Sequence, residues 1–143
     1  MRAALAVCLL SVTASVGADD IVLPVMLDRP ALEGGLYEQV ETRISTLDWS
    51  GGINTTETAE AFVSDDGRMR MGLFRSDAVT INRTTPRPLN EYMHFIQGGA
   101  RFTAPDGTVF DVKAGESILV PRGWVGLFET EGYLKLYVAY TPE

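Results

Sequence analysis

From Thr58 to the end of the chain, short runs rich in β-branched, aromatic and other apolar residues follow one another, and turn-forming residues separate them. Four of the turns are marked by Asp65-Asp66-Gly67, Gly98-Gly99, Pro105-Asp106-Gly107 and Pro121-Arg122-Gly123. The runs themselves are residues 58–64, 68–74, 78–84, 91–97, 100–104, 108–112, 117–121, 125–130 and 133–140. Many short strands with frequent turns and no convincing helical period are typical of β-barrels and β-sandwiches. The sequence therefore predicts an all-β domain.

The first 18 residues have the features of an export signal. Arg2 is followed by an apolar stretch from Ala3 to Val16, and small residues ending in Ala18 precede two acidic residues. This order is typical of a signal peptide, and the stretch is too short for a comfortable transmembrane helix. We therefore expect cleavage after Ala18, a mature chain without a membrane span, and a periplasmic or secreted location. The alternative is a buried helix of the domain.

Three further segments complete the predicted organisation. Residues 19–36 contain two prolines and a glycine pair, and we interpret them as an extended N-terminal arm packed on the domain. The apolar spacing of residues 36–49 fits either a strand or a short amphipathic helix, and we favour the strand. Residues 50–58 have the composition of a loop. The β-barrel domain is assigned to residues 37–143.

Charge and cysteine content narrow the choice of partners. The chain of 143 residues has a net charge of −7, and its one cysteine, Cys8, lies in the predicted signal. The mature chain would then have neither a disulfide nor thiol chemistry. An acidic chain without a basic cluster disfavours nucleic acid and anionic lipid as partners. We expect a small-molecule ligand as partner, with a homodimer kept as an alternative to a monomer.

The spacing of turn residues after Glu91 resembles the cupin superfamily. Glu91 is followed at the expected distance by Gly98, and Gly115, Pro121 and Gly123 keep the spacing of the second cupin motif. Glycine and proline suit the tight turns between barrel strands. In cupins, two histidines before the glutamate and one after the second glycine complete a metal site of three nitrogens and one oxygen.

The metal-ligand positions of that pattern hold other residues. The three histidine positions fall on Thr85, Arg87 and Gly126, so that only Glu91 remains. Arginine is permanently cationic and repels a metal ion, and glycine has no side-chain donor. A single carboxylate does not make a tight transition-metal site. We therefore expect a barrel with no metal and no other cofactor.

A narrower resemblance covers residues 72–140, which are similar to the small cupins related to ureidoglycine aminohydrolase and the ethanolamine-utilisation cupins. The matching residues are Glu91, His94, Gly98, Asp106-Gly107, Gly115-Glu116, Pro121, Gly123, Gly126, Lys135 and Tyr137, with Phe128 where tryptophan is usual. The resemblance implies an all-β fold of the cupin type, a jelly-roll-like β-barrel with an N-terminal extension. It also implies that Lys135 and Tyr137 lie near the pocket.

Glu91 is the strongest candidate for a functional residue. On a strand it shares one face with Met93 and Phe95, and the cupin pattern places this face inside the barrel. A carboxylate among apolar side chains is costly unless it is paired. Arg87 or Lys135 could supply the cation, which leaves open the alternative that Glu91 is only a structural partner.

Our first functional hypothesis is a metal-free binding module for a small polar or anionic molecule. In it, Arg87 and Lys135 supply charge, and Trp124 and Phe128 supply apolar walls, although these two aromatic residues could equally belong to the core. The residues assigned to ligand binding are Arg87, Thr85, Met93, Trp124 and Phe128. A less specific alternative to both functional hypotheses is a structural or assembly role.

The second hypothesis is a hydrolase, lyase or isomerase that acts on a small amide, acid or sugar. Glu91 would be its general acid or base, and Lys135 or Tyr137 the counterpart. A metal-assisted variant would recruit Glu91 and His94 with Gln97 or Tyr137. Because His94 and Glu91 point to opposite faces of the strand, we expect His94 to be a hydrogen-bonded residue outside the pocket or at a subunit contact.

Overall fold

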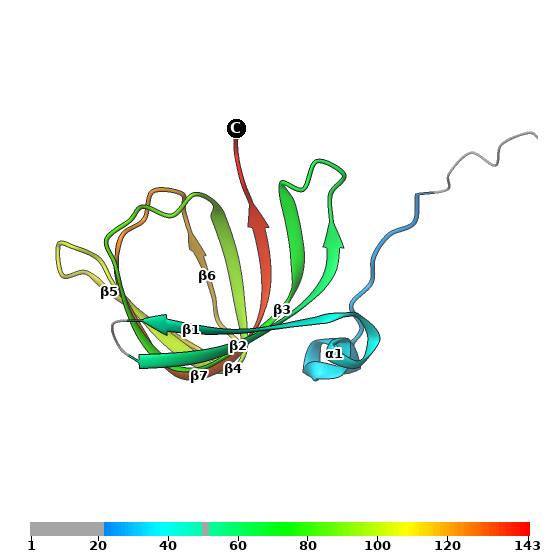
Figure 1. The fold of residues 1–143 in the computed structure, drawn as a ribbon, viewed down its shortest axis with the longest axis horizontal. Helices are drawn as coiled ribbons and strands as arrows, with labels where there is room; N and C mark the ends of the chain where they lie inside the picture. Colours follow the sequence, from blue (N-terminus) through cyan, green and yellow to red (C-terminus); the bar gives the residue numbers. More distant parts are fainter. Residues whose placement is uncertain (1–21, 50–51) are drawn as a thin grey trace, which may run out of the picture.

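The computed structural model describes residues 22–49 and 52–143, so the predicted signal peptide lies outside the described residues. The chain forms one seven-stranded antiparallel sheet that curves round into an open barrel (Figure 1). The strand order is β1-β2-β3-β7-β4-β5, with β6 paired to β4. The strands are β1 (Thr42–Trp49), β2 (Gly52–Val63), β3 (Met69–Arg83), β4 (Asn90–Thr103), β5 (Val109–Lys113), β6 (Ser117–Val120) and β7 (Gly126–Tyr140). The prediction of an all-β barrel is confirmed.

Strands β3, β4 and β7 are longer than the sequence predicted, because each joins two of the predicted runs. The glycine pair Gly98-Gly99 bends β4 and does not end it, and the pairing of β4 with β7 shifts register at this point. Gly98 has φ 68°, and a Cβ atom there would lie 2.1 Å from the carbonyl oxygen of Gly132. Only glycine allows the two strands to approach so closely at the bend.

The loop predicted for residues 50–58 is wrong from Gly52 onward, because these residues begin β2. The side chains of Asn54, Thr56 and Thr58 are buried, and the more exposed Thr55 and Glu57 lie between them. Asn54 donates hydrogen bonds to the Ser76 hydroxyl (3.0 Å) and to the Asp77 carbonyl (3.2 Å). These hydrogen bonds to the bend of β3 allow polar residues with a loop-like composition to form an inward-facing strand.

The predicted extended arm is only partly extended. Residues from Ala31 form two helical turns, η1 (Ala31–Gly35) and α1 (Leu36–Gln39), so that the strand favoured for residues 36–49 begins at Thr42. Ala31 and Leu36 pack against an apolar patch on the outer face of β2, β3 and β7, beside the lower part of the barrel (Figure 1). Burying this patch explains why the segment is helical and not extended.

Tyr37 fixes α1 to the sheet through its ring and its hydroxyl group. The Arg75 guanidinium lies 4.3 Å from the ring centre, and the hydroxyl donates to the Glu57 carbonyl oxygen at 3.4 Å. Burial of this ring, partly opposed by the charge of Arg75, raises the pKa of Tyr37 to about 12. The phenol therefore stays neutral and keeps its donor role at physiological pH.

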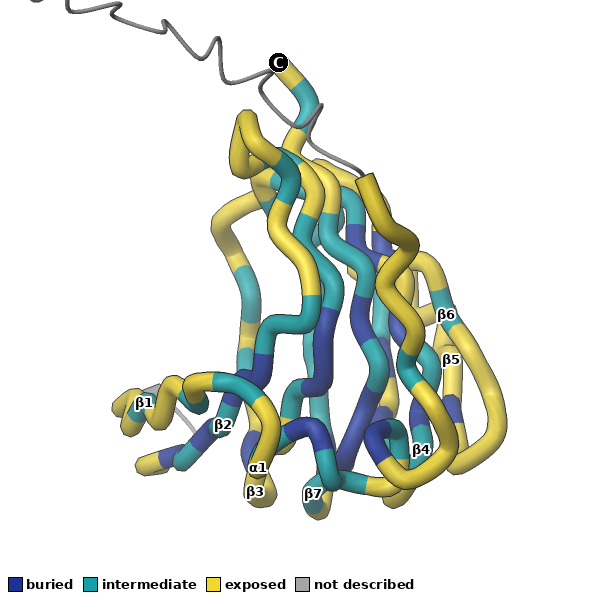
Figure 2. The backbone as a smooth tube through the Cα atoms, turned by 90° about the vertical axis from the view of Figure 1, so that its right-hand side faces the viewer, coloured by how far each residue is buried: buried dark blue, intermediate teal, exposed yellow. Residues whose placement is uncertain are grey.

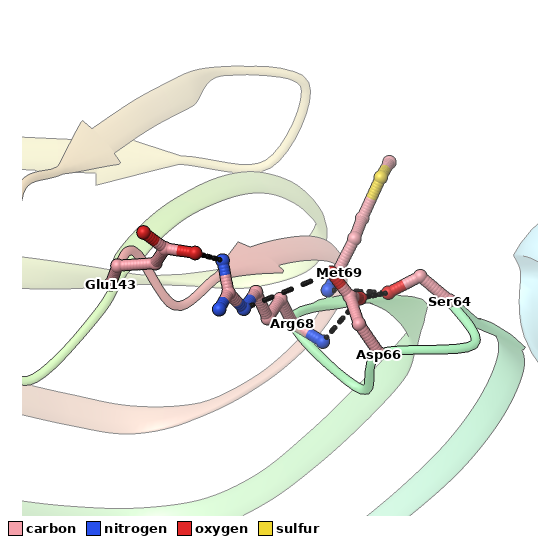
Figure 3. A network of polar contacts seen from close by, with 5 residues as sticks. All are labelled: Ser64, Asp66, Arg68, Met69 and Glu143. Atoms are coloured by element: carbon pink, nitrogen blue, oxygen red, sulfur yellow. Dashed lines mark hydrogen bonds and ion pairs between the residues drawn. The ribbon is translucent and has the colours of Figure 1, made fainter.

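The turn between β2 and β3 is held by a small polar network that reaches the C-terminus (Figure 3). The Ser64 hydroxyl donates to Asp66 at 2.6 Å and accepts from the Met69 amide at 2.9 Å. Asp66 accepts from the Arg68 amide, and the Arg68 guanidinium pairs with Glu143 at 2.8 Å. The predicted turn at Asp65-Asp66-Gly67 is therefore present, and it ties the last residues of the chain to the barrel.

Two apolar clusters stabilise the barrel from its two faces. The inner cluster contains Met93, Phe95, Ala100, Phe102, Val112 and Val120, and the outer cluster lies beneath the helical turns. Figure 2 shows the buried positions gathered in the lower part of the barrel, with the hairpins exposed at the top. In the part of the chain that the structure describes, no helix is long and apolar enough to cross a membrane.

Candidate functional site

The inner face of the barrel leaves a cavity of about 300 Å³. Side chains from β1, β2, β3, β4 and β7 and from the connections after β3 and β6 line it. The charged lining residues are Arg43, Glu60, Arg70, Arg83, Arg87, Glu91 and Lys135. Such a volume lies at the lower end of the range for small-molecule sites, about 300–1,000 Å³.

Glu91 lies at the centre of a buried ion network. Its two carboxylate oxygens are taken by two different cations, the Arg87 guanidinium and the Lys135 ammonium, and the lysine distance is 2.6 Å. The side chain of Glu91 is 11% exposed and that of Lys135 is 7% exposed. The predicted pairing of Glu91 with Arg87 or Lys135 is thus present with both partners. Pairing of this kind compensates for the loss of water around a buried carboxylate.

Burial and pairing act in opposite directions on the pKa values of this network. Burial by itself would raise the pKa of Glu91, but Lys135 and Arg87 together hold it below its ordinary value. Burial would likewise lower the pKa of Lys135, but the negative charge of Glu91 holds it above its ordinary value. At neutral pH the carboxylate and the ammonium are therefore both charged.

Near Glu91, Arg83 and Arg87 carry positive charge that the ion pairs do not fully neutralise. In the described part of the chain, the ion pairs of the lining residues are Arg87–Glu91, Lys135–Glu91 and Arg70–Glu60. Arg83 and the exposed Arg43 are in none of them, and burial together with the charge of Arg87 lowers the pKa of Arg83. The Nε atom of Arg87 is buried and has no hydrogen-bond partner among the described residues. An orphaned buried donor of this kind is costly unless a ligand or water satisfies it.

Aromatic rings form the walls of the cavity beside these two arginines. Phe102 packs edge-to-face on Phe128, with ring centres 5.0 Å apart, and on Trp124 at 5.7 Å. The backbone places these rings near the arginines, since Arg83 pairs with Gly126 across β3 and β7 and Arg87 donates its amide to the Trp124 carbonyl. The Lys135 ammonium lies 5.0 Å from the ring centre of Phe74.

A second charged cluster contains Glu60, Arg70 and Tyr137. Arg70 pairs with Glu60 at 3.2 Å, and the Tyr137 hydroxyl donates to the same carboxylate at 3.2 Å. The Arg70 side chain is 44% exposed, so water reaches this pair. Burial, reinforced by Glu60, raises the pKa of Tyr137 well above its ordinary value, and the phenol remains a neutral donor.

The residues at the cupin metal positions do not fit a metal ion. Both oxygens of Glu91 are engaged by cations, and Arg87 carries a positive charge into the place of a ligand. A Cβ atom on Gly126 would lie 2.4 Å from the Thr103 carbonyl oxygen, so a histidine cannot replace this glycine without a shift of the backbone. Within residues 22–49 and 52–143, no three His, Cys, Asp or Glu side chains are grouped as metal ligands.

The alternative metal set around His94 is not assembled either. The Nδ1 atom of His94 lies 2.9 Å from the Ser117 hydroxyl, on the face of β4 opposite to Glu91. Gln97 is exposed and does not line the cavity. The prediction that His94 is a hydrogen-bonded residue outside the pocket agrees with this geometry.

Most of the site residues predicted from sequence meet in the cavity. Glu91, Lys135, Tyr137, Arg87, Met93, Trp124 and Phe128 all line it. Thr85 does not: it is exposed in the connection after β3, because the chain there leaves the sheet and turns its side chain to solvent. Sequence reasoning also missed the lining residues Arg43, Asn54, Thr56, Thr58, Glu60, Arg70 and Arg83. Residues 54–60 are polar except for Ala59, so the sequence carries no alternation that would have marked the inward-facing positions of β2.

No family model matches this chain, and no curated protein matches it in sequence. Solved structures do match. A protein of unknown function of the DUF861 family from Pseudomonas syringae pv. tomato is 17% identical with a TM-score of 0.63, over 70% of this chain and 44% of that one. The chain thus spans less than half the length of this relative.

Two further structures share the same architecture. The EutQ protein of Clostridium difficile is 21% identical with a TM-score of 0.56, over 69% of this chain and 80% of that one. The cupin domain of Cnp3 from Schizosaccharomyces pombe is 18% identical with a TM-score of 0.50, over 61% of this chain and 65% of that one. At these identities the likeness concerns the fold, which is the one predicted from the motif spacing after Glu91.

Proposed function

We propose that this chain, which has the cupin fold, binds a small organic anion in its barrel cavity without the help of a metal ion. The observation that carries the proposal is the charge of the cavity lining. Five cationic side chains face two carboxylates there, an excess of three positive charges in a chain whose net charge is −7. Positive charge concentrated in a partly enclosed site attracts anions even when the protein as a whole is acidic.

Binding is favoured over catalysis by the state of the titratable groups. A general base needs a pKa near the working pH. The cationic partners Lys135 and Arg87 hold the pKa of the buried Glu91 below its ordinary value, which makes it a weak base at neutral pH. Lys135 is held protonated and the phenol of Tyr137 is held neutral, so neither is an activated base or nucleophile. The three residues therefore lack the base or nucleophile that the amidohydrolase, lyase or isomerase hypothesis requires, although Lys135 and Tyr137 carry the proton that a general acid needs.

The proposal is tested by thermal unfolding of the purified protein with three matched pairs of ligands: acetate and acetamide, succinate and succinamide, benzoate and benzamide. A ligand that binds only the folded state raises the melting temperature. We expect at least one carboxylate to raise it, its amide to have little effect, and added sodium chloride to weaken the shift. Equal shifts with acid and amide, or no shift with any compound, would refute the proposal.

Independence from metal is tested separately. Because the residues at the cupin metal positions do not fit a metal ion, dialysis against a chelator should leave both the melting temperature and the carboxylate-induced shift unchanged. Loss of the shift after chelation, with recovery on addition of a transition metal, would show that a metal takes part.

We also propose that the chain is exported, on the strength of the signal-like sequence that ends at Ala18. The expected result is a mature protein that begins at Asp19, seen by intact mass measurement of material recovered from outside the cytoplasm. Retention of Met1 in that material would contradict the proposal.

A further inference from the structure

The two charged clusters of the cavity differ in how far their charges are neutralised. Near Glu60, the carboxylate is paired with Arg70 and also accepts from Tyr137. Near Glu91, one carboxylate serves two cations, and Arg83 adds a third positive charge beside them. An anion therefore gains most where Arg83 and Arg87 lie together, since two like charges in a half-buried place repel each other until an anion arrives.

Arg87 is oriented to receive such an anion. Its Nη2 atom is fixed by Glu91, which orients the planar guanidinium, while the buried Nε donor has no partner among the described residues. A guanidinium carries five N–H donors, so Arg87 keeps positive charge and further donors for a carboxylate beyond the bond to Glu91. Arg83, which lies on the last pair of β3 with β7, supplies a second donor to the same region.

The surface next to the two arginines suits a flat apolar group. Phe102, Phe128 and Trp124 line the cavity there, and the buried ring of Phe102 packs edge-to-face on the partly buried rings of the other two. Edge-to-face and offset-stacked packing rewards an aromatic partner beyond its buried area. A cavity of about 300 Å³ has room for a ligand of about one ring.

We infer that the ligand is a planar aromatic monocarboxylate, held with its carboxylate between Arg83 and Arg87 and with its ring against Phe102, Phe128 and Trp124. This inference rests on the proposed function and narrows it to one ligand class and one end of the cavity. A single carboxylate is favoured because Arg70 near Glu60 is already paired, Arg43 at that end, which has no ion pair among the described residues, is exposed to water, and a second acidic group there would meet the charge of Glu60.

The test is isothermal titration of the purified protein with four probes: benzoate, cyclohexanecarboxylate, acetate and benzamide. Benzamide, which lacks the negative charge, should bind about tenfold or more weakly than benzoate, because charge-assisted hydrogen bonds to two arginines are lost. Cyclohexanecarboxylate should bind about threefold to tenfold more weakly than benzoate, since its saturated ring buries a similar area but cannot pack as an aromatic ring. Acetate should bind more weakly than both.

Three variants locate the carboxylate. Arg83→Gln should weaken benzoate about tenfold, and Arg70→Gln less than about threefold, because Arg70 belongs to the neutralised cluster. Arg101→Gln is the matched control for loss of one positive charge, since Arg101 is exposed and pairs with Asp111 at 2.7 Å. Each variant is titrated only after its unfolding curve shows that it is folded. Phe128→Leu should bring the affinities for benzoate and cyclohexanecarboxylate close together.

The outcomes separate this inference from the proposed function. If acetate binds as tightly as benzoate and Arg83→Gln still weakens both, the aromatic class is refuted and anion binding stands. If Arg70→Gln weakens benzoate as much as Arg83→Gln or more, the assigned end of the cavity is refuted. If none of the carboxylates binds, both proposals fail together. Benzoate bound tenfold tighter than benzamide and severalfold tighter than cyclohexanecarboxylate, with the loss confined to Arg83→Gln and Phe128→Leu, supports the inference.

Discussion

Two glutamates on the inner face of the barrel form ion pairs of the same kind in different surroundings. The side chains of Glu91 and Arg87 are 11% and 16% exposed, whereas those of Glu60 and Arg70 are 27% and 44% exposed. Glu91 is shared by two cations, while Glu60 has one cation and a phenol. From this difference in burial we expect the Glu91 pairs to contribute more to stability than the Glu60 pair.

At the Glu60 cluster, water competes with the pair and screens it, so the cluster adds little to stability. At the Glu91 cluster, removal of one partner would leave another as an unpaired buried charge. Loss of any single member should therefore destabilise the fold. The same network leaves surplus positive charge at Arg83 and Arg87. In our account one feature, a carboxylate outnumbered by buried cations, thus supports both the fold and the affinity for anions.

The largest expected effect comes from Glu91→Gln. This change leaves Lys135 and the guanidinium of Arg87 without a counter-charge, and breaking a buried pair in this way costs about 3–5 kcal/mol. The free energy of unfolding in urea, measured for both proteins, checks this value. A loss below about 1 kcal/mol would mean that Glu91 behaves like Glu60 and that the contrast between the two clusters is wrong.

A smaller effect is expected from acid alone. The folded-state pKa of Glu91 lies below its ordinary value of 4.5, so the stability that it contributes is present above pH 4.5 and is lost as pH falls through the folded-state pKa. Unfolding curves between pH 7 and pH 3 should therefore show a fall in stability below about pH 4.5. Glu91→Gln should show a shallower fall, and an equal fall in both proteins would contradict the assignment to Glu91.

The alkaline side offers the complementary measurement. The folded-state pKa of Lys135 lies above its ordinary value of 10.5, so its contribution is complete below pH 10.5 and is lost as pH rises through the folded-state pKa. We expect stability to decline above that pH in the wild type and less so in Lys135→Met, which should already be destabilised at neutral pH. A Lys135→Met protein with wild-type stability at pH 7 would exclude a structural role for the pair.

The smallest effects belong to the Glu60 cluster. Glu60→Gln and Arg70→Gln remove one member of a hydrated pair, and each should change the free energy of unfolding by less than about 1 kcal/mol. Glu60→Gln is the matched control for Glu91→Gln, because the same chemical change is made in the more exposed cluster and measured by the same urea titration. A cost of several kcal/mol in either variant would show that the two clusters are energetically alike.

The sequence predicted the Glu91 cluster better than the Glu60 cluster, and the reason is physical. Strand alternation grouped Glu91 with Met93, the cupin pattern placed their common face inside the barrel, and the resemblance to the small cupins implied that Lys135 lies near the pocket. Arg83 and Arg70 could not be assigned in the same way, because their position depends on the register of β3 against β7, which is a long-range property.

The turn composition of residues 50–58 also misled the sequence-based prediction. Threonine is common in loops, but here Thr56 and Thr58 face inward from a strand that the bend of β3 stabilises through Asn54. The assignment of Thr85 to ligand binding was wrong for a similar reason, because the cupin spacing gives its place along the chain and not the point at which β3 ends. Local composition does not report either of these tertiary effects.

The most direct test of the account is a crystal structure of the protein with 4-bromobenzoate, in which the anomalous signal of bromine fixes the orientation of the ligand. We predict a carboxylate within hydrogen-bond distance of the guanidinium groups of Arg83 and Arg87, with the ring against Phe102 and Phe128. The ion pairs of Glu91 should remain unchanged. A carboxylate on Arg70 or Arg43, or a cavity without ligand at a concentration that saturates the thermal shift, would contradict the account.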